Sequence, residues 1–189
     1  YAGTHAQHVS ALVLRGSFLA SPREMTWFFQ SLRALVPSGW ERLTNGWSDA
    51  QKADVLRTLA NALLAGDSAQ ASDAARRWSD YETAVMEAMA GKLDGAGATS
   101  GELPPRVLHK YRLQAHYLTH GCFTSEEELL RLAGSLTQLP VAIVHGTHDL
   151  VCPPENALRL AQAMPHAQLR WMEKAGHTPA DPAIAAGLR

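Results

Sequence analysis

The sequence predicts an α/β protein in which part of a mostly parallel sheet is interrupted by a long all-helical segment. Three observations predict this fold class. Short apolar runs that end in glycine occupy residues 9–16 and 139–146, as buried strands do. Residues 168–172 alternate between apolar and polar side chains, as a half-buried strand does. Between the first two runs the apolar residues recur only at helical spacing, which indicates helices inserted between strands.

Helix-start signals divide the middle of the chain. Serine or aspartate precedes each apolar periodic stretch, with a glutamate or glutamine three residues later in the boxes at 21–24 and 48–51. Further helices are predicted to begin at Asp67, at Pro104-Pro105 (ending near residue 116) and after Ser125. Residues 91–101 are rich in glycine and small polar residues and predict a loop.

The two ends of the chain complete the predicted organisation. Tyr1 to Ala6 is interpreted as the last turns of a helix, and helices are expected at 155–164 and 183–188. The sequence therefore predicts an α/β core from residues 1–16 and 137–189 and a helical cap from residues 17–136.

The composition of the chain argues against several classes of function. The chain has 189 residues and a formal net charge of −1, so it lacks the basic surplus typical of proteins that bind nucleic acid or anionic membranes. No apolar run reaches the roughly 18 residues of a membrane span. Two cysteines do not make a disulfide framework, no signal peptide is visible in residues 1–9, and we expect a cytoplasmic setting. No histidine pair has metal-ligand spacing together with a further cysteine or carboxylate, so neither a metal nor another cofactor is expected.

Two residues near the carboxyl ends of predicted strands carry the chemistry. Asp149 follows the strand at 139–146, and His177 follows the next strand, at 168–172. Ligands of parallel α/β sheets bind at this edge. An aspartate there can fix the tautomer of a histidine, which then acts as a general base. The alternative is that Asp149 is a turn residue and His177 an ordinary loop histidine; the strand–helix–strand spacing favours the catalytic pair.

The nucleophile that such a pair would serve has no obvious place in the sequence. In hydrolases with the order nucleophile, acid, histidine, the serine lies in a G-x-S-x-G turn. That pattern does not occur here, and Ser17, Ser21 and Ser48 have the settings of strand-end and capping residues. We therefore expect the chain to be the C-terminal part of an α/β-hydrolase, cut just after the serine and inactive alone.

Five motifs in order make a family resemblance specific. The chain resembles the proline iminopeptidases at residues 14–18 with 27–30, 78–82, 116–123, 146–153 and 175–177. The resemblance implies an α/β-hydrolase fold with a helical cap and release of an N-terminal proline through an acyl-enzyme, from a small peptide or amide with a free N-terminus.

The resemblance also implies substrate-binding residues. Glu82 matches a cap carboxylate that holds the substrate amine, and Phe18 and Phe28 match aromatic residues of the proline pocket; plain core packing is the alternative for both aromatics. Gln114 stands where relatives have a second amine-binding carboxylate. Because glutamine offers no charge, amine recognition is expected to be weaker. Cys152 matches a cysteine near the active site, with a small buried apolar role as its alternative.

Two other functions remain open. The intact protein could be an esterase, amidase or epoxide hydrolase, because a fold does not determine its substrate. The chain could also be a complete, non-catalytic binding module. A sheet with so few strands would then leave an apolar edge exposed, which argues against this alternative.

Overall fold

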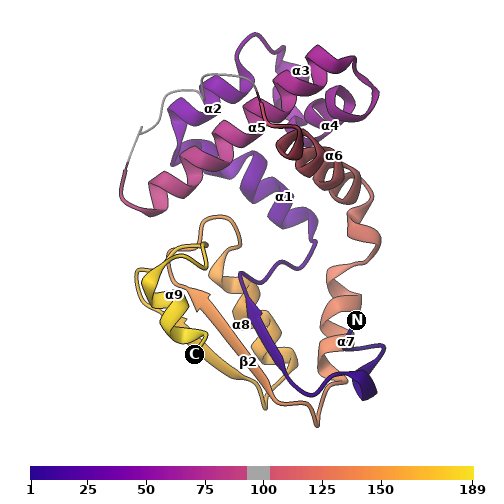
Figure 1. Cartoon of the computed structure of the whole chain (residues 1–189), viewed down its shortest axis with the longest axis vertical. Coiled ribbons are helices and arrows are strands. Elements are labelled where there is room, and N and C mark those ends of the chain that lie inside the picture. Colours follow the sequence, from indigo (N-terminus) through magenta and orange to yellow (C-terminus); the bar gives the residue numbers. More distant parts are fainter. Residues whose placement is uncertain (93–102) are drawn as a thin grey trace. The chain divides into compact units, whose positions relative to one another are not determined.

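The structure, a computed structural model, describes residues 1–92 and 103–189 (Figure 1). The predicted loop at 91–101 falls largely on residues 93–102, outside the described residues. The described chain divides into two compact units, one formed by Tyr1–Glu24 with Thr124–Arg189 and the other by Met25–Phe123. The predicted limits of core and cap, at residues 16 and 137, concern domains and stay predictions.

A three-stranded parallel sheet forms the centre of the first unit. Its strands are β1 (Leu12–Arg15), β2 (Val141–Gly146) and β3 (Gln168–Met172), in the order β1-β2-β3. Leu14 is in register with Ile143, and Ile143 with Leu169. In parallel strands the carboxyl ends lie at one edge, so the loops after all three strands meet there. The α/β class and the parallel sheet are confirmed.

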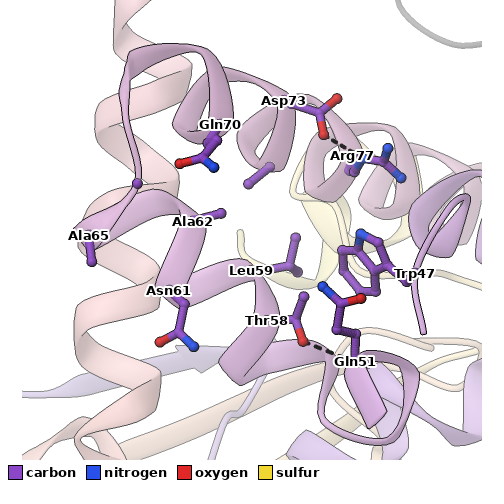
Figure 2. Close-up of a pocket in the computed structure, with 12 residues that line it drawn as sticks. Trp47, Gln51, Thr58, Leu59, Asn61, Ala62, Ala65, Gln70, Asp73 and Arg77 are labelled. Carbon is purple, nitrogen blue, oxygen red and sulfur yellow. Dashed lines mark hydrogen bonds and ion pairs between the residues drawn. The ribbon is translucent and has the colours of Figure 1, made fainter. Parts of the chain in front are cut away.

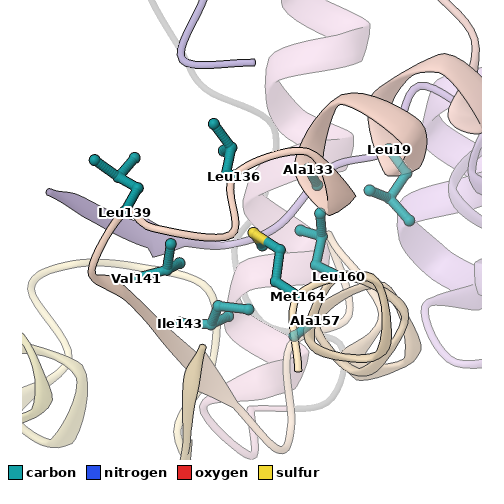
Figure 3. Close-up of a cluster of buried hydrophobic side chains, with 9 residues drawn as sticks. All are labelled: Leu19, Ala133, Leu136, Leu139, Val141, Ile143, Ala157, Leu160 and Met164. Carbon is teal, nitrogen blue, oxygen red and sulfur yellow. The ribbon is translucent and has the colours of Figure 1, made fainter. Parts of the chain in front are cut away.

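Helices cover the sheet with apolar side chains. α7 (Glu126–Gly134) and α8 (Pro154–Ala163) pack together, and α8 contacts β2 and β3. Figure 3 shows Val141 and Ile143 of β2 facing Ala157, Leu160 and Met164. β2 is buried along nearly its whole length, as a near-continuous apolar run in a parallel sheet should be.

The two ends of the chain belong to this unit as well. The C-terminal helix α9 (Pro182–Gly187) contacts β2 and β3, and Asp181 caps it by accepting from the Ala183 N–H. The prediction of helical turns over Tyr1 to Ala6 is wrong. These residues form a turn closed by the Thr4 and His5 amides on the Tyr1 carbonyl, followed by the short 3-10 helix η1 (Ala6–His8).

The regular elements of the second unit are all helices in its described residues. Its elements in chain order are most of α1 (Pro22–Phe29), η2 (Ser31–Ala34), α2 (Pro37–Thr44), α3 (Asp49–Ala53), α4 (Val55–Ala65), α5 (Ser68–Met89), α6 (Pro105–Thr119) and η3 (Gly121–Phe123). The capping boxes predicted at Ser48 and Ser21 form, and Asp67 caps α5. The helix predicted from Ser48 is broken at Asp54, whose non-helical backbone precedes the start of α4.

An aromatic core holds the second unit together. Trp78 and Tyr81 of α5 are fully buried, and Phe28 and Phe29 meet them edge-on at centroid distances of 5.4 Å. The Tyr81 hydroxyl donates to the Phe28 carbonyl at 2.9 Å. Burial raises the pKa of Tyr81, so its hydroxyl stays a neutral donor. Across residues 1–92 and 103–189, no helix combines the length and the apolar character that crossing a bilayer requires.

Candidate active site

The loop after β2 holds Asp149 in a fixed position. Its Oδ1 accepts from the backbone N–H groups of Val151 at 3.0 Å and Cys152 at 2.9 Å. The carboxylate is buried. A buried carboxylate needs such donors to replace water, and these come from the backbone rather than from mobile side chains. Oδ2 is left to bind a histidine.

His177 lies against that second oxygen. Its Nδ1 is 2.8 Å from Asp149 Oδ2, and its side chain is a quarter exposed. A carboxylate can only accept, so Nδ1 carries the proton and Nε2 is left as the basic nitrogen. The Arg15 guanidinium, from the end of β1, donates to the His177 carbonyl and holds the histidine loop. The structure thus brings together the two residues that the sequence singled out, from loops 28 residues apart.

Two glycines let the loops come this close. A Cβ at Gly146 would lie 2.3 Å from the Ala175 carbonyl oxygen, a contact that requires the backbone to move. Gly16 has a φ of +56°, and a Cβ there would lie 2.8 Å from Cε1 of His177. Glycine permits the close approach at both positions and the left-handed backbone at Gly16.

His145 is a third polar residue of this site, and sequence reasoning did not assign it a role. The ring is completely buried. Its Nε2 lies 2.9 Å from the Cys152 carbonyl and 3.6 Å from Asp149 Oδ2, while its Nδ1 accepts from the Ser17 N–H at 3.4 Å. Burial lowers the pKa of His145, so it is a neutral bridge between the loops that follow β1 and β2. A sequence feature that could have indicated this role is the histidine itself, within an otherwise apolar predicted strand.

Glu82 is the corresponding carboxylate of the helical unit. Its Oε2 accepts from Lys110 Nζ at 2.6 Å and from the Tyr111 hydroxyl at 2.8 Å, and its Oε1 accepts from the Gln114 amide at 3.3 Å. All three donors belong to α6. Glu82 and Gln114, which the resemblance had paired, therefore lie in contact, and Lys110 is an additional partner.

Comparison with known proteins agrees with the α/β fold. The family model described as the alpha/beta hydrolase fold matches residues 1–181. The chain belongs to the α/β-hydrolase family. It is also a homologue of proline iminopeptidases, which confirms the resemblance stated from the motifs.

The relatives of this α/β-hydrolase are longer than the chain. A proline iminopeptidase of Xylella fastidiosa is 34% identical over 184 residues, which is 96% of this chain and 58% of the relative. That of Xanthomonas citri is 35% identical over 173 residues (90% and 54%), and that of Neisseria gonorrhoeae 29% over 191 residues (100% and 59%). The chain therefore spans a little over half the length of the curated relatives it matches.

The remaining predicted site residues differ in burial. They are Phe18, Phe28 and Cys152. Phe18 is 40% exposed in the first unit, whereas Phe28 is buried in the aromatic core of the second. The packing of Phe28 matches its core alternative, and pocket roles for both stay predictions. Cys152 is buried, and burial raises the pKa of its thiol, so it is a poor thiolate. Its backbone binds Asp149 and His145.

The helical unit also contains a cavity, whose described lining residues include one ion pair. It measures about 570 Å³ and opens between α3, α4 and α5, as Figure 2 shows. The ionisable side chains that line it, Asp73 and Arg77, pair with each other at 2.6 Å. In the part of the chain that the structure describes, histidine, cysteine and acidic side chains form no cluster of three that could hold a metal ion.

Proposed function

We propose that this chain supplies the acid, the base and the substrate-binding helices of a serine hydrolase of the proline iminopeptidase type. The observation that carries the proposal is the Asp149–His177 contact of 2.8 Å, with the acid held by two backbone N–H groups. An oriented aspartate–histidine pair is what a serine hydrolase needs to activate its nucleophile.

The proposed mechanism gives each residue one task. His177 Nε2 takes the proton of the serine hydroxyl as it attacks the substrate carbonyl, and returns it to the leaving amine. Asp149 keeps Nδ1 protonated and stabilises the imidazolium that forms. The sequence has no G-x-S-x-G turn, so the serine and the oxyanion hole are proposed to come from a segment of the protein preceding Tyr1, and this chain alone to be inactive.

The proposed substrate is a small peptide or amide with an N-terminal proline. Glu82 is proposed to bind its ammonium, and Phe18 and Phe28 to contact its ring. A carboxylate whose side chain is 22% exposed is a suitable partner, since both charges lose water only when they pair. Homology with proline iminopeptidases supports this substrate class.

Another specificity within the same family is a second candidate, favoured by Gln114. An amide in place of a carboxylate removes one negative charge from the proposed amine site, and charge-assisted hydrogen bonds are about twice as strong as neutral ones. An esterase or amidase that ignores the substrate amine fits such a site equally well.

Hydrolysis assays on the protein that includes the preceding segment test both candidates. We expect turnover of a proline anilide, a lower rate with its N-acetylated form, and a loss of about 10³-fold or more in His177→Ala. His8→Ala, an exposed histidine of the same unit, is the matched control and should keep full activity. Equal turnover of both anilides would favour the second candidate. Full activity in His177→Ala would contradict both candidate functions, because each requires His177 as the general base.

A further inference from the structure

The Glu82 pocket already contains a cation. Lys110 Nζ lies 2.6 Å from Glu82 Oε2 and 4.5 Å from the centroid of the Tyr111 ring. These are the two contacts by which a protein pocket binds an ammonium group, a charge-assisted hydrogen bond and a cation–π contact. Lys110 therefore makes the interactions that a substrate ammonium would need.

The Glu82 carboxylate has few hydrogen-bond positions left for a ligand. Gln114 and Tyr111 donate to Glu82 together with Lys110, so both of its oxygens are engaged. Burial and the nearby Glu82 charge raise the pKa of Tyr111, so its hydroxyl remains a neutral donor. The formal charge of Glu82, Lys110 and Gln114 together is zero. A free ammonium gains no net charge attraction from these three residues unless Lys110 leaves.

The pocket is open enough for Lys110 to leave. A cavity of about 360 Å³ is lined by Glu82, Lys110 and Tyr111, and Glu87 also lines it. The Lys110 side chain is 53% exposed, and exposed ion pairs are weak. Lys110 is thus a displaceable competitor, whose expected effect on ligand affinity is several-fold and not absolute.

We propose that Lys110 is a specificity-determining residue, an internal ammonium that neutralises Glu82 and lowers the preference for substrates with a free N-terminus. The inference rests on the proposed role of Glu82 as the amine-binding group. It assigns to this pocket ligands whose corresponding end is uncharged, such as N-acylated amides and esters, alongside free amines.

Binding to the protein that includes the preceding segment, with His177→Ala to stop turnover, tests this without any catalytic step. The probes are L-prolinamide, which is protonated near neutral pH, and N-acetyl-L-prolinamide, which carries no charge, each titrated by NMR or calorimetry. We expect the native protein to bind L-prolinamide only about twofold more tightly than the acetylated probe. Lys110→Met should bind L-prolinamide about fivefold more tightly and leave the acetylated probe unchanged, since losing an exposed ion pair of up to about 1 kcal/mol corresponds to that factor. Arg57→Met removes another exposed, paired cation of the same unit and should change neither affinity.

Two double variants test whether the gain in affinity for L-prolinamide depends on Glu82. Combined with Lys110→Met, Glu82→Gln should abolish the gain in affinity, whereas Glu87→Gln, at another residue that lines the cavity, should retain it. Lys110→Gln replaces Lys110→Met if the latter lowers the melting temperature.

Three outcomes would overturn the proposal. They are a native protein that already prefers L-prolinamide tenfold with no gain in the Lys110 variants, a gain that survives Glu82→Gln, and a pocket that binds neither probe in any variant. Failure of the longer protein to hydrolyse anilides would refute the proposed function and leave these affinities as they are.

Discussion

Asp149 in the sheet unit and Glu82 in the helical unit are both largely buried carboxylates with three donors each, but the donors differ in kind. Asp149 is held by two backbone N–H groups and by His177. Glu82 is held by three side chains of one helix. Backbone donors persist whatever side chains the loop carries, whereas side-chain donors change with single substitutions. Single substitutions are therefore expected to alter the proposed amine site more readily than the position of the proposed acid.

The largest effect should come from Asp149→Asn in the protein that carries the nucleophile. The amide would leave His177 free to adopt the wrong tautomer, so hydrolysis should fall by about 10⁴-fold while the fold persists. Steady-state kinetics measure the loss, with circular dichroism as the check on folding. Glu82→Gln, in contrast, should act mainly on KM. If the two substitutions had similar effects on kcat, the contrast between the two carboxylates would be wrong.

An intermediate effect is expected from His145, which ties the Asp149 loop to the loop after β1. His145→Leu leaves the Ser17 N–H and the Cys152 carbonyl unpaired, at about 1–3 kcal/mol of unfolding free energy for each buried group. Urea unfolding measures it, and His145→Gln, which keeps a donor, should lose less. Equal losses in the two variants would mean that packing, and not hydrogen bonding, is what His145 contributes.

The same histidine predicts a pH dependence of stability. Burial holds the pKa of His145 below its ordinary value of 6.5, although the Cys152 carbonyl and the Asp149 charge act to raise it. Below pH 6.5 the unfolded chain therefore binds a proton that the folded chain does not. The contribution to stability is complete above pH 6.5 and declines as the pH falls toward the folded pKa. Urea titrations of the native chain should show this decline, and His145→Gln should show a smaller one.

The strands and the acid–histidine pair could be predicted from the sequence, because they depend on local residue patterns and on the order of elements along the chain. The strands β2 and β3 fall within the predicted runs, and the Asp149–His177 spacing followed from one strand–helix–strand unit. The break at Asp54 and the short helices η1 and η2 were missed, because single-residue backbone changes leave the apolar periodicity almost unaltered. Lys110 was missed for another reason. It meets Glu82 across 28 residues of sequence, and no local pattern reports a contact between two helices.

The smallest predicted effect tests the side-chain donors that hold Glu82. Tyr111→Phe removes one of the donors of Glu82 and leaves Lys110 and Gln114 in place, so the free energy of unfolding should fall by about 1 kcal/mol. Tyr117→Phe, at an exposed position of the same helix, is the matched control and should change it by less than about 0.5 kcal/mol. Chemical denaturation compares the two. An unchanged stability in Tyr111→Phe would show that the Glu82 carboxylate does not depend on this hydroxyl, and that Lys110 and Gln114 alone hold it.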